Sequence, residues 1–160
     1  MRNKVKIIAF DADDTLWENE SYFQETEAEF CKLLEKYLPS EEISKELFKT
    51  EMQNMPIYGY GIKAFTLSLI ETALRITNNK AEGEIIEQIL NLSKELLNKD
   101  VVVLDGVKQV LAELQGKYKL VVATKGDLLD QERKLHKSGL EKYFHHIEIM
   151  SDKQIADYQI

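Results

Sequence analysis

Three acidic residues within four positions, Asp11, Asp13 and Asp14, directly follow an apolar run that begins at Ile7. A short apolar run that ends so abruptly is typical of a buried strand. In open α/β sheets the active site lies at the carboxyl ends of the strands. Carboxylates repel one another and are seldom gathered without a cation, and oxygen-only ligands suit Mg²⁺. The segment therefore predicts a metal-assisted site in which one carboxylate can attack a substrate.

Two further strand ends carry polar residues suited to the same chemistry. An apolar run over 119–123 ends at Thr124 and Lys125, and a third run over 146–150 is followed by Lys153. Parallel strands place their carboxyl ends on one edge of a sheet, so we expect these residues to converge with the acidic turn. A nucleophile, an acid–base group, a hydroxyl and a cation together are what the handling of a phosphoryl group requires.

Between the first and second of these strands the pattern is helical. From about residue 18 to residue 99, apolar residues recur at three- and four-residue spacing, and no convincing strand occurs. The sequence predicts four amphipathic helices there, separated by breaks at 39–40, 56–61 and 78–79. Four such helices with short connections form a bundle.

Strands and helices alternate after residue 105, with helices predicted over 107–114 and 127–138. This alternation argues for a parallel sheet with right-handed crossovers. The sequence therefore predicts an α/β core made of residues 1–17 and 100–160. The helical stretch over 18–99 would interrupt this core just after its first strand.

Composition excludes several functional classes. The 160 residues allow one buried core and a small additional unit. The net charge of −7 comes from residues 18–100, which hold 16 acidic and 9 basic side chains, so no basic face for nucleic acid is expected. No apolar run is long enough to span a bilayer, and the single cysteine, Cys31, cannot form an internal disulfide. We therefore expect a cytoplasmic protein that binds neither nucleic acid nor membrane.

The ordered set of motifs resembles the haloacid dehalogenase superfamily of hydrolases. The first motif of that family, Asp-x-Asp-x-Thr after an apolar strand, stands here as residues 11–15. Its second motif matches the apolar strand that ends at Thr124, and its third matches Lys153. The resemblance implies a Rossmann-like core, in which the helical stretch forms the cap of members that act on small metabolites.

The resemblance also implies a role for each motif residue. Asp11 would attack phosphorus and form an aspartyl-phosphate, and Asp13 would protonate the leaving oxygen and then activate water. Thr124 and the backbone N–H of Lys125 would hold the phosphate, and Lys153 would neutralise it. Mg²⁺ would be bound by the Asp11 carboxylate and the Asp13 carbonyl. We therefore expect a magnesium-dependent phosphoric monoester hydrolase that acts on a small phosphorylated metabolite.

Other interpretations remain open. Dehalogenases of the superfamily lack the second acid, so Asp13 favours phosphoester chemistry over C–halogen cleavage. A phosphosugar mutase shares these motifs but returns the phosphoryl group to its substrate, and a non-catalytic remnant or binding module is a third alternative. Taken singly, Asp11 and Asp13 could form a turn or a helix cap, Thr124 could simply end a strand, and Lys153 could be a surface lysine.

Seven residues follow Lys153, whereas the superfamily continues with a helix and a further strand that ends in acidic residues. We expect a core truncated after its third strand. The chain would be a shortened form of a larger enzyme, or a short protein whose exposed first strand is covered by a partner or by self-association. Either case predicts weak or absent phosphatase activity for these 160 residues alone.

Overall fold

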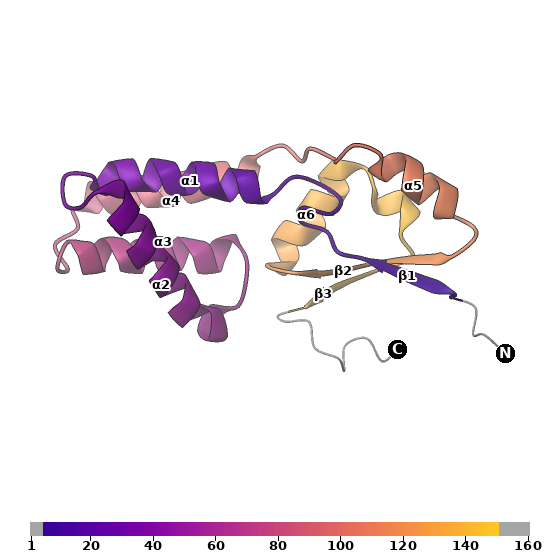
Figure 1. The fold of residues 1–160 in the computed structure, drawn as a ribbon, viewed down its shortest axis with the longest axis horizontal. Helices are drawn as coiled ribbons and strands as arrows, with labels where there is room; N and C mark the ends of the chain where they lie inside the picture. Colours follow the sequence, from indigo (N-terminus) through magenta and orange to yellow (C-terminus); the bar gives the residue numbers. More distant parts are fainter. Residues whose placement is uncertain (1–4, 151–160) are drawn as a thin grey trace. The chain divides into compact units, whose positions relative to one another are not determined.

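The computed structural model describes residues 5–150. The chain divides into two compact units, one made of Met1–Glu20 with Asp100–Ile160 and the other of Ser21–Lys99. The first unit contains a parallel sheet and the second contains helices (Figure 1). Among the described residues, no helix combines the length and the apolar composition that crossing a bilayer requires.

The sheet unit has three described strands in the order β1-β2-β3, all parallel, which confirms the predicted fold class. Phe10 pairs with Val122, so the residues that follow β1 and those that end β2 leave the sheet at the same edge. The elements of this unit are, in chain order, β1 (Ile7–Phe10), α5 (Val107–Leu114), β2 (Lys119–Lys125), α6 (Leu128–Ser138), the short 3-10 turn η1 (Glu141–Tyr143) and β3 (His146–Met150).

Helices α5 and α6 cover the same face of the sheet (Figure 1). Leu111 of α5 and Leu135 of α6 form one apolar cluster with Leu120 and Val122 of β2, and all four are buried. The other face has no helix over it among the described residues of this unit, and Ile7 of β1 is 45% exposed. The prediction of a buried first strand is therefore wrong for β1, because only the central strand, β2, has a continuous run of buried residues.

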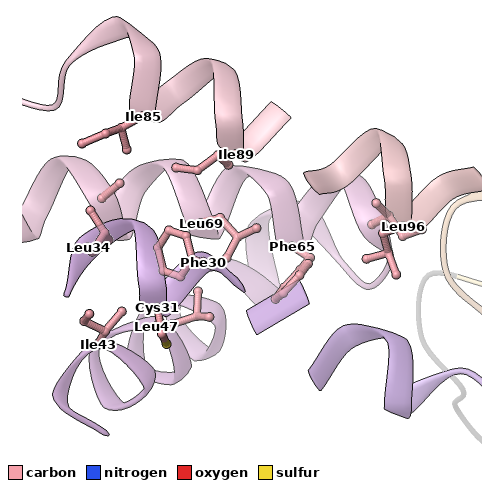
Figure 2. Packing of buried hydrophobic residues seen from close by; sticks show 12 residues of the cluster. Phe30, Cys31, Leu34, Ile43, Leu47, Phe65, Leu69, Ile85, Ile89 and Leu96 are labelled. Carbon is pink, nitrogen blue, oxygen red and sulfur yellow. The ribbon is translucent and has the colours of Figure 1, made fainter. Parts of the chain in front are cut away.

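The helical unit contains four helices, as the apolar spacing predicts: α1 (Glu20–Leu34), α2 (Ser40–Tyr58), α3 (Ile62–Ile76) and α4 (Gly83–Asn98). Their apolar faces meet in a single core, part of which Figure 2 shows. Phe30 of α1, Leu47 of α2, Leu69 of α3 and Ile89 of α4 are each fully buried in it. This packing is the expected result of apolar residues that share one helical face.

Helix α2 is longer than its sequence indicates, because Pro56 lies inside the last turn instead of opening a loop over 56–61. A proline removes its own backbone N–H hydrogen bond and its ring crowds the carbonyl four residues earlier, and α2 continues for only two residues beyond it, to Tyr58. The N–H of Gly59 donates to the carbonyl of Met55 at 3.0 Å and closes this turn. The helix therefore ends at glycine, not at proline.

Candidate active site

The turn after β1 presents neighbouring side chains in different environments. Asp11 is exposed, Ala12 is fully buried and Asp13 is partly buried. The Ala12 carbonyl accepts hydrogen bonds from the N–H groups of Thr15 at 3.1 Å and Leu16 at 2.7 Å. The Thr15 hydroxyl lies 3.5 Å from Asp11 Oδ2, at the outer limit of a hydrogen bond. The turn thus leaves the Asp11 carboxylate accessible and directs Asp13 toward the interior of the unit.

Trp17 fixes the position of one Asp13 oxygen. Its side chain is buried, and its backbone bridges to Asp13 on one side and to Val103 on the other. The indole Nε1–H donates to Asp13 Oδ1 at 2.8 Å. A buried indole usually directs its N–H at a partner, and the surrounding packing restricts its movement. Trp17 is therefore a fixed donor to the Asp13 carboxylate.

Helix α6 supplies two further donors to the same carboxylate. Gln131 Nε2 donates to Asp13 Oδ2 at 3.0 Å, and Lys134 Nζ donates to Oδ1 at 2.9 Å. Residues three positions apart lie on one face of a helix, so a single face of α6 provides both groups. Lys134 Nζ also donates to Asn19 Oδ1 at 2.8 Å. The Asp13 carboxylate thus accepts hydrogen bonds from an indole, an amide and an ammonium group.

Gln131 connects Asp13 to the end of β2. Its Nε2 lies 2.9 Å from Thr124 Oγ1 and 2.8 Å from the Lys125 carbonyl oxygen. An amide NH₂ has two hydrogens, so three acceptors share them. The Oε1 atom of the same amide is buried without a hydrogen-bond partner in the described part of the chain. Thr124 is itself buried, so its hydroxyl is turned into this network instead of toward solvent.

Gly126 allows α6 to begin so close to the strand end. Its φ of 127° lies in the region that favours glycine. A Cβ atom at this position would lie 3.4 Å from the Gln131 side chain, so the space is already filled to contact distance. Helix α6 begins two residues later, at Leu128. The glycine turn therefore brings Gln131 back against Thr124.

Helix α6 also carries an acidic residue next to Lys134, Asp130. Asp130 is buried, and its carboxylate lies 3.6 Å from Lys134 Nζ and 3.8 Å from Arg133 Nη1. Burial raises the pKa of Asp130 above its ordinary value of 3.8, Lys134 and Arg133 lower it, and the nearby Asp13 and Asp127 raise it. The net result is a raised pKa, because loss of hydration outweighs the two cations.

The structure brings some of the predicted site residues together. Asp13 meets Thr124 and the Lys125 carbonyl at a single amide, that of Gln131. Asp11 leaves β1 at the same edge of the sheet. Lys153 lies outside the described residues.

Gln131, Lys134 and the indole of Trp17 were not singled out as site residues by the sequence. A glutamine or a lysine within an amphipathic helix is ordinary, and composition alone gives neither a role. The available signal is positional, because both follow Gly126 within two turns on a helix that starts at the predicted site edge. Their three-residue spacing then places both on the face that can turn back toward the strand ends.

The donor set at the acidic turn is compatible with Mg²⁺. No group of three or more His, Cys, Asp or Glu side chains that could hold a metal occurs among residues 5–150. Mg²⁺ is commonly held by one or two carboxylates, while water and substrate phosphate supply its other ligands. The exposed Asp11 carboxylate and the nearby Asp13 carbonyl meet this requirement. The Asp13 carboxylate already accepts three hydrogen bonds, so the carbonyl is the better candidate ligand.

The only cysteine in the sequence, Cys31, lies in the core of the helical unit. Burial raises the pKa of its thiol, with a lowering contribution from the Ser44 hydroxyl and a raising one from Glu27. The thiolate is the reactive form of cysteine, so this environment argues against a nucleophilic or metal-binding role.

A family model for haloacid dehalogenase-like hydrolases matches residues 5–157 of the chain. The chain belongs to this family. The match includes both motif strands, α6 and Lys153, so the family assignment covers the whole candidate site. No curated protein matches the chain.

Solved structures of haloacid dehalogenase-like (HAD) proteins have the same fold. A family hydrolase from Xanthomonas campestris is 38% identical with a TM-score of 0.90, over 96% of this chain and 65% of that one. YfnB from Bacillus subtilis, assigned to the HAD hydrolases and bound to magnesium, is 18% identical with a TM-score of 0.59, over 92% and 66%. A predicted phosphoglycolate phosphatase from Haemophilus somnus is 17% identical with a TM-score of 0.56, over 97% and 67%. The chain thus spans about two thirds of the length of these relatives.

Proposed function

We propose that this haloacid dehalogenase-like protein is a magnesium-dependent phosphatase that acts on a small phosphorylated metabolite through an aspartyl-phosphate. The observation that carries the proposal is the pairing of two acids in one turn. Asp11 is exposed, and Asp13, two residues later, is fixed by three hydrogen-bond donors. One carboxylate is therefore accessible as a nucleophile, and the other is oriented for proton transfer.

In the first half of the reaction, the Asp11 carboxylate attacks phosphorus while the bond from phosphorus to the leaving oxygen breaks. Asp13 gives its proton to that oxygen, so the alcohol leaves as a neutral group. The phosphoryl group is then bonded to an oxygen of the Asp11 carboxylate as an acyl phosphate. Division of one displacement into two is the usual advantage of a covalent intermediate.

In the second half, the Asp13 carboxylate takes a proton from water, and the resulting hydroxide attacks the aspartyl-phosphate. Inorganic phosphate leaves, Asp11 returns to its carboxylate form, and Asp13 is protonated for the next cycle. Oδ1 of Asp13 accepts two hydrogen bonds and Oδ2 accepts one, so Oδ2 is the better candidate for both transfers. The backbone N–H of Lys125 and the Lys153 ammonium would bind the phosphate oxygens.

Mg²⁺ bound by the Asp11 carboxylate and the Asp13 carbonyl would neutralise phosphate charge and so favour the approach of an anionic nucleophile. Thr124 contributes differently from the sequence-based expectation. Its buried hydroxyl bonds to Gln131 and the Lys125 carbonyl, so we assign it first to the support of the strand end. A direct phosphate contact would require this hydroxyl to turn away from the Lys125 carbonyl.

The test is phosphate release from a panel of small phosphomonoesters, at high enzyme concentration so that slow turnover is measurable. We expect slow Mg²⁺-dependent release that EDTA abolishes, and none from the Asp11→Asn variant. Beryllium fluoride with Mg²⁺ should stabilise the wild-type chain against heat but not Asp11→Asn. Equal release by the two chains, together with no stabilisation by beryllium fluoride, would overturn the proposal.

Two alternatives predict different products. A phosphosugar mutase would isomerise a hexose phosphate without net phosphate release, and a dehalogenase would release halide from a 2-haloacid without acting on phosphoesters. The dehalogenase is disfavoured because Asp13 is held next to the nucleophile by three donors, Trp17 from the turn after β1 and two residues of α6. A non-catalytic binding module would show neither product nor beryllium fluoride stabilisation.

A further inference from the structure

We propose that Lys134 is a positioning residue that fixes the Asp13 carboxylate, and that it is not a ligand of the phosphate. The inference rests on the proposed function and adds a specific residue to it. Lys134 lies in the middle of α6, more than a hundred positions along the chain from Asp13. Its assignment comes from geometry, because no motif in the sequence marks it.

The Lys134 ammonium group is directed at protein oxygens. Nζ donates to Asp13 Oδ1 at 2.9 Å and to Asn19 Oδ1 at 2.8 Å, and it lies 3.6 Å from Asp130 Oδ2. An ammonium group has three hydrogens: two donate to Asp13 and Asn19, and Asp130 lies just beyond hydrogen-bond distance as an ion-pair partner. The Lys134 side chain is 16% exposed, which leaves little of it accessible to a substrate. A lysine in this setting orders its neighbours instead of capturing an anion.

The position of Lys134 gives the Asp13 carboxylate a defined orientation. Trp17 Nε1 and Lys134 Nζ both donate to Oδ1, whereas Gln131 alone donates to Oδ2. Two donors on Oδ1 prevent the carboxylate from rotating, so Oδ2 stays on the side where Gln131 meets Thr124. Catalysis depends on such fixed geometry, because a proton donor that swings freely is rarely aligned when the bond breaks.

Asn19 is a second residue that the Lys134 ammonium group holds in place. It follows the acidic turn directly, and its own N–H donates to Asp14 Oδ1 at 2.9 Å. Lys134 therefore ties α6 both to the carboxylate of Asp13 and to the segment that leads into α1. Loss of the ammonium should loosen the acidic turn at both places.

The test compares Lys134→Met, Lys134→Arg and a matched control, Lys137→Met, which removes an exposed charge from the same helix. The probe is Mg²⁺-dependent hydrolysis of p-nitrophenyl phosphate. We expect Lys134→Met to lower kcat by roughly 10- to 100-fold with KM within about twofold of wild type, as for other groups that support a catalytic side chain. Lys134→Arg should recover part of kcat, and Lys137→Met should leave it unchanged.

Three results would overturn the assignment. A raised KM with unchanged kcat would make Lys134 a phosphate ligand. An unchanged kcat in Lys134→Met would mean that the contact has no role in turnover. An equal loss in Lys137→Met would show a general effect of charge on α6, because that side chain is exposed and three residues further along.

A second measurement separates this inference from the proposed function. Urea midpoints are compared for Lys134→Met, Asp13→Asn, the double variant and wild type. We expect the urea midpoint of the double variant to fall by less than the sum of the two single-variant decreases, because each single change already breaks the same contact. If the decreases in midpoint are not additive and the wild-type chain releases no phosphate, the proposed function is overturned and the contact is supported. If the wild-type chain releases phosphate and the decreases in midpoint are fully additive, the role of Lys134 is overturned and the proposed function stands.

Discussion

The Asp13 carboxylate and the Thr124 hydroxyl accept hydrogen bonds from one and the same nitrogen, Nε2 of Gln131, at 3.0 and 2.9 Å. These residues are more than a hundred positions apart in the sequence, and one follows β1 while the other ends β2. The shared donor fixes the distance between the two strand ends at the candidate site. It also makes the site sensitive to a residue that has no catalytic chemistry of its own.

Replacement of Gln131 by Met should therefore damage turnover more than folding. Met keeps a similar length but cannot donate, so Asp13 Oδ2 and Thr124 Oγ1 both lose their link. We expect kcat for phosphomonoester hydrolysis to fall roughly tenfold or more. Glu132→Met, an exposed neighbour on the same helix, is the matched control. Steady-state kinetics together with far-UV circular dichroism distinguish the two effects, and a kcat equal to that of wild type would contradict the prediction.

Asp14 should stabilise the start of α1. Its carboxylate accepts hydrogen bonds from the N–H groups of Asn19 at 2.9 Å and Glu20 at 3.1 Å, and its φ is 56°. Asp14→Ala loses this cap and places alanine in a left-handed conformation, so we expect the free energy of unfolding to fall by about 1–2 kcal/mol. Asp14→Asn retains an acceptor and should lose less.

Urea unfolding of Asp14→Ala, Asp14→Asn and Asp100→Ala tests this prediction. Asp100 is an exposed aspartate, so its replacement controls for the loss of a negative charge. Equal midpoints for Asp14→Ala and Asp100→Ala would show that the capping hydrogen bonds contribute nothing.

Asp130 should make stability depend on pH. Burial raises its pKa in the folded chain above 3.8, so the folded state holds this proton more tightly than the unfolded state. The contribution of Asp130 to stability is therefore fully present below pH 3.8 and is lost as pH rises through the folded pKa. Asp130→Asn cannot ionise, so its stability relative to wild type should increase from acid pH to neutrality.

The measurement is the difference in urea midpoint between wild type and Asp130→Asn at several pH values. Asp105→Asn, at an exposed position, serves as the control for the loss of a carboxylate. A difference that stays constant, or that decreases as pH rises, would contradict a raised pKa for Asp130 in the folded chain.

Two leucines on α3, one buried and one exposed, allow the contribution of core packing to the stability of the helical unit to be measured. Leu69 is fully buried, whereas Leu67 is 40% exposed. Leu69→Ala should lower the free energy of unfolding by about 2–5 kcal/mol through lost burial and the cavity left behind. Leu67→Ala should change it by about 0.5 kcal/mol or less. Denaturant unfolding followed by circular dichroism measures both, and similar losses would contradict the core shown in Figure 2.

The sequence predicts the parallel α/β class because apolar runs and apolar spacing encode strands and helices locally. It fails where the outcome depends on what covers a surface. Ile7 is apolar and yet exposed, whereas its strand neighbours Ile8 and Phe10 pack against the apolar cluster of the sheet unit. Pro56 is a helix breaker in general and yet lies inside α2, which continues for two residues beyond it.

The candidate site is predictable to the extent that it consists of strand ends. Asp11, Asp13 and Thr124 follow apolar runs, so topology alone assigns them to one edge. Gln131 and Lys134 depend on how a helix rotates about its axis when it packs on the sheet, and local sequence does not encode that rotation. The full environment of Asp13 therefore becomes visible only with coordinates.

Helix α6 carries Leu135 in the apolar cluster against the sheet and, one residue before it, Lys134 against Asp13. Any change that shifts or rotates α6 against the sheet therefore displaces both side chains together. A conservative substitution in the packing between α6 and the strands would therefore move Lys134 relative to Asp13. Such a variant could retain its secondary structure and its melting temperature and still be a poor catalyst.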